Sequence, residues 1–526
     1  MSASMYKKVG IASLIMIASV FLSRVIGVFR EMVIANFAGT SGSVDAYQVS
    51  FVIPEILNHV AATGFLSITF IPIFSNLVTS NRELEGWRVF SNILNTFGIV
   101  LIGFTIMLSF FADSLIGYTG LKHTANFQEA VRLTRIVIPA QIFFFMGGIL
   151  MAVQFAKEQF LIPALAPLIY NGGIILGGVL LYPKLGMEGF SWGALCGAVI
   201  GNFVIQFFGA RSVGLKWFPV IDIKHPEFKR YFLLTLPLII GMTISFSNEI
   251  IPKLFGSFLS EGSIASLNYG FRITFILVGL FGQAVGTASY PYLSKLAIEN
   301  KILELNRLLN NILRKISLVI PCSILVILLR KEIVYLLFQR GQFNADSTIM
   351  TSNILICLMI GAFAFTAQTI VNRGFYAMQN TLFPTVCVTV ILILTLPLYY
   401  LGMINFEIYG IALAISVSTI FQVTILYIFW NKRSSNNEAK AVYLFYLKII
   451  FISIPLGALL FGAKYWLLAG FNSLSLVGSL IHLVVLSLLF IASLFFIGYV
   501  FKIREIFEIS DFVCERLKGF GRKIAG

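Results

Sequence analysis

Nine charged side chains interrupt long apolar stretches of this 526-residue sequence, and they are its best guide to function. A charge at the centre of a bilayer costs at least ~2.5–3.5 kcal/mol, so such residues pair with one another or face an aqueous cavity. All of them except Lys464 fall in two groups, at 24–55 and 249–272. This grouping predicts one polar cavity lined by Arg24, Arg30, Glu31, Asp45, Glu55, Glu249, Lys253 and Arg272.

Three arginines make the expected cavity cationic. Arg24 and Arg30 are six residues apart, which in a helix separates them by about 9 Å along the axis and about 120° around it. They can line one broad wall with Arg272 facing them, and the planar guanidinium favours a phosphate or pyrophosphate ligand. The alternative is that Arg30–Glu31 or Arg24–Asp45 are structural pairs, or that Arg24 extends toward the cytoplasmic interface.

The remaining charged residues have other expected roles. Glu31 and Asp45 are expected to be the acidic or gating residues of the cavity. Glu249 and Lys253, four residues apart, either pair on one helix face or leave Glu249 to bind a coupling ion, Na⁺ or H⁺. Lys464 is near the end of its apolar stretch and is expected to extend to the interface. The spacing of the His and Cys residues indicates no catalytic residue, no cofactor and no metal site.

The composition indicates that the helices carrying these residues lie in a membrane. The chain is 58% apolar and 12% charged, whereas soluble domains carry roughly 25% charged residues, so a soluble enzyme is excluded. A spanning helix needs roughly 20 apolar residues. The sequence therefore predicts an all-α polytopic membrane protein with about fourteen transmembrane helices, at 10–36, 44–76, 89–112, 130–155, 162–182, 188–210, 231–257, 263–293, 312–330, 349–375, 383–402, 407–431, 444–468 and 475–501.

The net charge of +15 is explained by orientation. Most Lys and Arg residues fall in alternate loops, which the positive-inside rule assigns to the cytoplasm together with both termini. No nucleic-acid partner is therefore expected. The tail at 502–526 alternates apolar and charged residues as an amphipathic helix on the cytoplasmic leaflet would, with a disordered tail as the alternative.

Short motifs recur about 220 residues apart. Pro72-Ile-Phe-Ser75 returns as Pro291-Tyr-Leu-Ser294, and Phe155-Ala156 returns as Tyr376-Ala377. We therefore expect two pseudo-symmetric six-helix lobes with the substrate path between them. The expected divisions are an N-lobe at 1–228, a C-lobe at 229–442, two further helices at 443–501 and the tail at 502–526.

The same charged segments carry a family resemblance that extends over essentially the whole chain. The sequence resembles the MurJ/MviN family in these ordered motifs: Ser23-Arg-Val-Ile-Gly27-Val-Phe-Arg30-Glu31, Phe37-Ala-Gly39, Asp45-Ala46, Phe70-Ile-Pro72, Pro163-Ala164, Tyr269…Arg272, Gly279-Leu-Phe-Gly282, Phe338-Gln-Arg-Gly341 and Gly374-Phe-Tyr376-Ala.

The resemblance implies a fourteen-span flippase of the multidrug/oligosaccharidyl-lipid/polysaccharide exporter superfamily, in which the last two helices form a groove for a lipid tail. It implies translocation of lipid II, the undecaprenyl-pyrophosphate-linked peptidoglycan precursor, by alternating access across the bacterial inner membrane. That activity serves peptidoglycan synthesis, cell-wall biogenesis and cell shape. The expected partners are this lipid-linked glycan and membrane lipids, and a monomer is expected. In the family, the residues matching Arg24, Arg30, Arg272 and Glu31 are functional.

The chain departs from the family pattern in ways that leave the glycan open. It has Asn58-His59 where the family has two arginines, Thr63 where the family has Glu, and Phe271 and Phe275 at acidic positions. A flippase for another polyprenyl-linked glycan, such as O-antigen or exopolysaccharide, is the alternative. A glycosyltransferase would need carboxylate or metal clusters in larger loops, and a channel would need a filter motif, so neither an enzyme nor a channel is expected.

Overall fold

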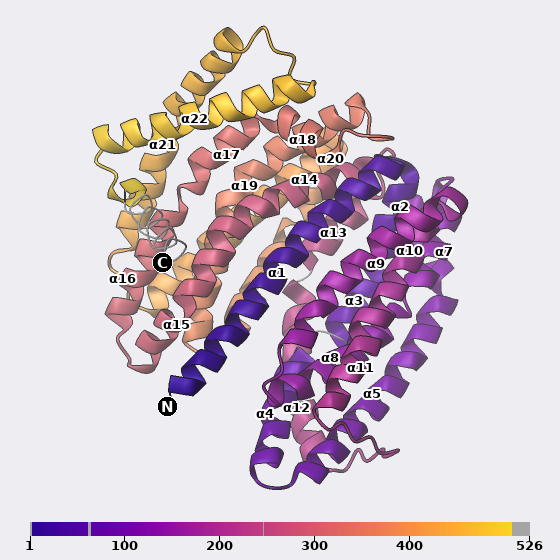
Figure 1. The fold of residues 1–526 in the computed structure, drawn as a ribbon. Coiled ribbons are helices and arrows are strands. Elements are labelled where there is room, and N and C mark those ends of the chain that lie inside the picture. Colours follow the sequence, from indigo (N-terminus) through magenta and orange to yellow (C-terminus); the bar gives the residue numbers. More distant parts are fainter. Residues whose placement is uncertain (1–2, 62–64, 246, 508–526) are drawn as a thin grey trace, which may run out of the picture. The chain divides into compact units, whose positions relative to one another are not determined.

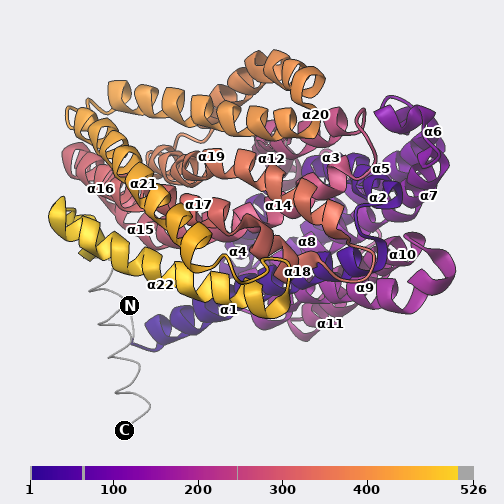
Figure 2. The ribbon, with the colours of Figure 1, turned by 90° about the horizontal axis from the view of Figure 1, so that it is seen from above.

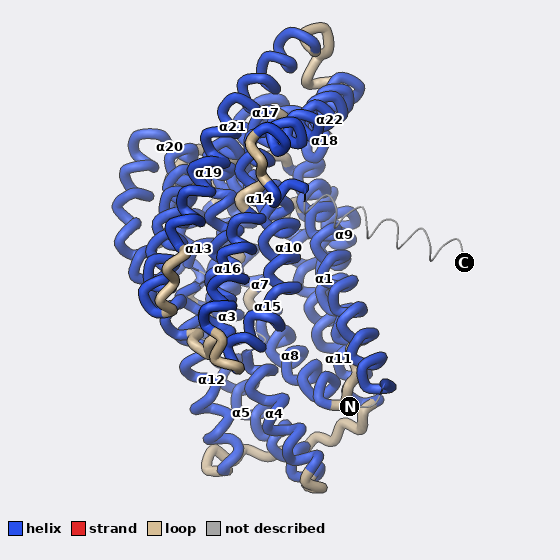
Figure 3. Tube along the Cα trace, turned by 90° about the vertical axis from the view of Figure 1, so that its left-hand side faces the viewer, coloured by secondary structure: helices blue, strands red, loops and turns tan. Residues whose placement is uncertain are grey.

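The structure is a computed structural model that describes residues 3–61, 65–245 and 247–507. Side chains are not described at 3–14, 17, 59–61, 65–68, 237–245, 247–249 and 284. Within the described residues the chain consists of helices and connecting loops, without strands (Figure 3). The expected all-α class is confirmed.

The chain divides into two compact units, of which the first comprises residues 1–265 and 340–344. In this unit α9 and α10 lie side by side (Figure 1) because each is glycine-rich along the contact. A Cβ added at Gly173 or Gly177 would come within 3 Å of the backbone of α10, the close approach that small residues permit between membrane helices. The helices of this unit are α1 (Ala3–Ala38), α2 (Gly42–Ser50), α3 (Val52–Ala61), α4 (Phe65–Thr79), α5 (Glu83–Phe110), α6 (Ala112–Ile116), η1 (Gly120–His123), α7 (Phe127–Val137), α8 (Ala140–Ala156), α9 (Leu161–Leu185), α10 (Glu188–Ala198), η2 (Val199–Val204), α11 (Ile205–Ser212), α12 (Pro226–Ser245) and α13 (Ser247–Gly256).

The second unit comprises residues 266–339 and 345–526. Its last two helices, α21 and α22, lie side by side (Figures 1 and 2). The 52-residue α20 is interrupted at Glu407, which has a non-helical backbone, so it consists of two helices. The helices are α14 (Ser263–Val278, which begins in the first unit), η3 (Gly279–Gln283), α15 (Ala284–Ile298), α16 (Ile302–Ile316), α17 (Val319–Leu328), α18 (Arg330–Phe338), α19 (Ala345–Ala377), α20 (Leu382–Arg433), α21 (Ala439–Leu467) and α22 (Leu476–Val500).

Ten helices among the described residues are long and apolar enough to cross a membrane. One of them is α20, whose two parts correspond to two of the predicted spans. The predicted spans at 10–36, 44–76 and 231–257 coincide with helices whose side chains are only partly described. The count of fourteen therefore stays a prediction.

The internal repeat is visible in the backbone of the turns. Asn81 and Asn300, 219 residues apart, both have positive φ, at 58° and 54°. Left-handed backbone is uncommon for residues other than glycine, so its return at a fixed spacing supports two related halves. Three further pairs recur at a spacing of 221 residues: Glu158 and Gln379, Gly186 and Glu407, and Gly214 and Ser435.

The two compact units do not end where the predicted lobes end. Helix α12 packs against α3 and α4 and so belongs to the first unit. The compact units are defined by contacts in space, whereas the predicted lobes are defined by the sequence repeat. The lobe boundaries at 228 and 442 therefore stay predictions. In the predicted tail, Ile503 and Ile506 are buried against α21 and α22, and residues 508–526 lie outside the described residues.

Candidate functional site

Helix α1 carries the first two predicted cavity arginines. Arg24 is exposed, and Arg30 is largely buried with 16% of its side chain accessible. The helix is built almost entirely from apolar residues around them. The two arginines therefore lie on one continuous helix, as their spacing predicts.

Arg30 is held by two partners. Its Nη2 is 2.5 Å from Oε1 of Glu31, which is 1% exposed, and its Nη1 donates to Oδ1 of Asn171 on α9 at 3.0 Å. The Asn171 amide nitrogen donates to the Pro167 carbonyl, and this bond orients the amide oxygen toward Arg30. Arg30 and Glu31 therefore form an ion pair, and the role of Arg30 in binding the substrate stays a prediction.

The pairing of Arg30 leaves part of its donor capacity unused. Its Nε is buried and has no hydrogen-bond partner among the described residues. A guanidinium has five N–H donors in a fixed plane, so the two contacts that hold Arg30 do not saturate it. Burying a charged donor without a partner is costly, and an anion that reached this group would offset that cost.

Asp45 caps a helix. Its carboxylate accepts hydrogen bonds from the backbone N–H groups of Gly262 and Ala265, at 2.7 and 2.8 Å, in the first turn of α14. An acidic side chain at this position satisfies free N–H groups and interacts favourably with the helix dipole. The structure thus gives Asp45, which is 4% exposed, a structural contact, while its expected gating role stays a prediction.

A further ion pair in the first unit joins α3 and α13. Lys253 Nζ lies 2.9 Å from Oε2 of Glu55, although the two residues are 198 positions apart in the sequence. The side chains of Glu249 and His59 lie outside the described residues, so the coupling-ion site at Glu249 stays a prediction. Lys253 has a carboxylate partner that the sequence argument did not identify.

Arg272 is exposed on α14 and belongs to the second unit. Its expected position facing Arg24 and Arg30 stays a prediction. The structure thus brings Arg30 and Glu31 together with a partner, Asn171, which sequence reasoning missed. The available signal was the Pro163-Ala164 motif, which lies on the same helix as Asn171, but nothing in the sequence said which way the amide would point.

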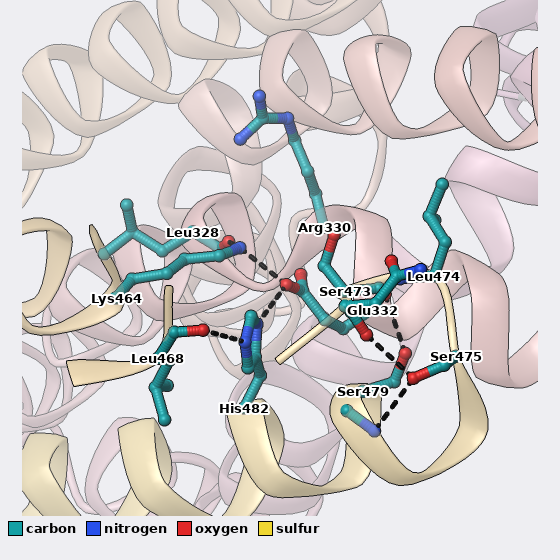
Figure 4. A network of polar contacts seen from close by, with 12 residues as sticks. Leu328, Arg330, Glu332, Lys464, Leu468, Ser473, Leu474, Ser475, Ser479 and His482 are labelled. Carbon is teal, nitrogen blue, oxygen red and sulfur yellow. Dashed lines mark hydrogen bonds and ion pairs between the residues drawn. The ribbon is translucent and has the colours of Figure 1, made fainter. Parts of the chain in front are cut away.

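The second unit contains a buried ionic cluster that sequence reasoning also missed (Figure 4). Glu332 of α18 is fully buried, and its Oε1 lies 2.7 Å from both Lys464 Nζ of α21 and His482 Nδ1 of α22. Lys464 also donates to the Leu328 carbonyl. The prediction that Lys464 extends to the interface is wrong, because it pairs with a buried carboxylate instead.

The sequence and fold match known transport proteins. The sequence model of the family described as "Lipid II flippase MurJ" matches residues 34–505. A probable lipid II flippase MurJ of Buchnera aphidicola subsp. Baizongia pistaciae is 30% identical over 414 residues, covering 77% of this chain and 80% of the relative. The lipid II flippase MurJ of Burkholderia cenocepacia is 26% identical over 467 residues, covering 86% and 88%.

Two solved structures show the same fold. One is a lipid II flippase MurJ in an inward closed conformation, with a TM-score of 0.76 and 24% identity over 93% of this chain and 100% of that one. The other is an inward-facing multidrug resistance transporter of the MATE family and MOP superfamily, with a TM-score of 0.63 and 14% identity over 78% and 94%. The chain is a multi-pass membrane protein, and it belongs to the lipid II flippase MurJ family.

Proposed function

We propose that this protein translocates lipid II from the cytoplasmic to the periplasmic leaflet of the bacterial inner membrane by alternating access, for peptidoglycan synthesis. The observation that carries the proposal is Arg30. Its guanidinium is oriented by Glu31 and Asn171 and retains a buried donor without a partner among the described residues. Membership of the lipid II flippase family supplies the substrate class.

The substrate pyrophosphate matches this chemistry. Planar N–H donors bind phosphate oxygens in pairs, and Arg24 lies on the same helix as Arg30. We expect Arg24, Arg30 and Arg272 to share the pyrophosphate while the lipid tail stays in the bilayer. Glu31 would then have two roles, because it orients Arg30 in the empty state and limits the net charge of the pocket.

The energy source follows from the charge of the cavity. The sequence lacks the G-x-x-x-x-G-K-[ST] motif that binds ATP phosphates. Each charge moved through the membrane potential is worth about 2.3 kcal/mol per 100 mV. The membrane potential is therefore an adequate energy source for returning a cationic cavity to its starting conformation, with Na⁺ or H⁺ as a coupling ion. We expect the protein to act as a monomer with both termini in the cytoplasm.

The test is a flipping assay in proteoliposomes with defined substrates. Wild-type protein should move fluorescent lipid II, and Arg24→Ala, Arg30→Ala and Arg272→Ala should each abolish movement at normal protein levels. The matched control is Arg132→Ala, because Arg132 forms an exposed ion pair with Glu188 and should not be required. Normal flipping by all three cavity variants would contradict the proposal.

The same assay discriminates among glycans. Liposomes that contain an O-antigen or exopolysaccharide precursor on the same polyprenyl pyrophosphate report the alternative substrate. Complementation of a strain depleted of its lipid II flippase provides the cellular measurement. Movement of only the other glycan, together with failed complementation at good expression, would replace lipid II as the substrate.

A further inference from the structure

A glycine in α15 makes room for an arginine of α19. The Arg373 guanidinium packs on Gly286, where an added Cβ would lie 2.7 Å from Nη1 and 2.9 Å from Cζ. Both residues belong to the second unit, and Arg373 lies one turn before the end of α19. Any larger residue at 286 would displace the guanidinium, so Gly286 determines where the charge sits.

The hydrogen bonds of Arg373 are incomplete. Its Nη2 donates to Oγ1 of Thr287 at 3.1 Å, and the Thr287 hydroxyl in turn donates to the Gln283 carbonyl. Its Nη1 is buried and without a partner within the described part of the chain, and the same is true of Oδ1 of the adjacent Asn372. A buried donor and a buried acceptor on consecutive residues are thus left unused, which is costly unless a ligand pairs with them.

Asn372 and Arg373, the residues that carry these groups, line an open cavity of about 430 Å³, a volume within the usual range for small-molecule sites. We call it the Arg373 cavity, and it is lined by Thr287, Tyr290, Thr369, Asn372, Arg373 and Tyr376. The lining offers one positive charge, hydroxyl and amide groups, and two aromatic rings, but no carboxylate. This combination suits an anion that carries hydroxyl groups, because the cation binds the charge and the neutral polar groups bind the hydroxyls.

We propose that the Arg373 cavity is a second binding subsite, which takes a phosphate-type oxyanion attached to a hydroxyl-bearing group. Two sources share this chemistry: the pyrophosphate-linked sugar of a lipid-linked glycan, and the headgroup of phosphatidylglycerol. Assignment to the glycan rests on the proposed function, whereas the preference for an oxyanion does not. The subsite is separate in sequence and helix from Arg24 and Arg30, since α15 and α19 build it.

The test is site-specific photo-crosslinking in the full-length protein. p-Azidophenylalanine replaces Tyr290, which lines the cavity and is 39% exposed. The protein is reconstituted in phosphatidylcholine liposomes that contain either radiolabelled lipid II or radiolabelled phosphatidylglycerol. The matched control places the same crosslinker at Tyr400, a 54% exposed tyrosine of α20 in the same unit that is not part of the cavity lining.

The expected result is capture at position 290 well above that at 400 for at least one of the two lipids. Arg373→Gln should lower this capture about 10-fold, because the charge-assisted hydrogen bonds are lost. Gly286→Ala should lower it by less, since the added Cβ displaces the flexible end of Arg373 without removing its charge. Arg307→Gln, which breaks an exposed pair with Glu438, should leave capture unchanged.

Two outcomes would overturn the subsite: capture at 290 no higher than at 400, or capture that Arg373→Gln leaves at the wild-type level for both lipids. Capture of phosphatidylglycerol alone would support the oxyanion subsite and identify bulk lipid as its source. Lipid II flipping is measured separately in the same liposomes. A protein that flips lipid II but shows no Arg373-dependent capture therefore refutes the subsite and not the proposed function.

Discussion

The two halves of the chain share their turns but not their charges. Positive φ at Gly186 recurs at Glu407, and that at Asn81 recurs at Asn300. The buried charges do not recur in the same way. In the first unit Arg30 pairs with its sequence neighbour Glu31, whereas in the second unit Glu332 joins α18 to α21 and α22, the two helices that follow the predicted repeat.

The difference shows which features a repeat retains. A turn depends on local backbone geometry, so related halves can keep it although residue types change, as from Gly186 to Glu407. A buried charge is costly and persists where it has a partner or a function. The common architecture of the two halves is therefore seen in the backbone conformation of the turns. The buried charges differ because each half keeps the charges that its own contacts or function require.

The largest expected effect concerns the buried cluster of the second unit. Glu332→Gln should lower the free energy of unfolding by about 3–5 kcal/mol, because Lys464 and His482 lose their buried partner. Thermal unfolding in detergent measures the change. Replacing the whole cluster with apolar residues of similar size, Glu332→Leu with Lys464→Met and His482→Phe, should restore much of the stability.

The control for this prediction is Glu299→Gln. Lys301 beside Glu299 lowers the pKa of that carboxyl, but both side chains are exposed, so salt and water screen the interaction. No measurable change in thermal unfolding is expected. An equal shift for Glu332→Gln and Glu299→Gln would show that the buried cluster does not connect the three helices energetically.

The shared turn is tested next. Gly186→Ala should destabilise the protein by about 1–3 kcal/mol, because φ 56° and ψ −138° are strained for a residue with a Cβ. In the described part of the chain, no atom beyond the neighbouring residues lies within 4 Å of the added Cβ, so the effect isolates the backbone. Gly27→Ala is the control, since Gly27 has equal space but a helical backbone. Unchanged thermal unfolding of Gly186→Ala would argue against a strained turn.

Removal of the helix cap should have a smaller effect. Asp45→Ala should cost about 0.5–2 kcal/mol, because the N–H groups of Gly262 and Ala265 lose their acceptor. Hydrogen exchange followed by mass spectrometry should show faster exchange at these two amides, while Asp45→Asn retains part of the protection. Wild-type exchange at both amides in Asp45→Ala would refute the cap.

The smallest expected effect has the opposite sign. Glu407→Gly should stabilise the protein by about 0.5–1 kcal/mol, because Glu407 occupies a backbone conformation (φ 52°, ψ −133°) that glycine adopts freely. Asn405→Gly, in the exposed helix two residues earlier, should instead destabilise by a similar amount. The thermal unfolding temperatures of the two variants separate the relief of backbone strain from the general cost of a glycine. A Glu407→Gly variant less stable than the wild type would contradict the predicted strain at Glu407.

Sequence reasoning identified residues better than it identified partners. It placed Arg24 and Arg30 on one helix, and it found the paired motifs at Pro72 and Pro291, because helical spacing and repetition are local properties. It did not find Asn171 as the second partner of Arg30, and it did not find that Arg373 of α19 packs on Gly286 of α15. Those contacts depend on which helices pack together, and spacing along the chain does not report that.

The sequence by itself determined that the chain is an all-helical membrane protein with costly internal cations. The physical reason is that the length of each apolar stretch, and the charged residues within it, can be taken directly from the sequence. It also determined the family through ordered motifs. Only the tertiary structure decided that Lys253 pairs with Glu55 across 198 positions and that Lys464 pairs with Glu332. The physical reason is that a buried charge is neutralised by whichever partner helix packing brings within about 3 Å, at any distance in the sequence.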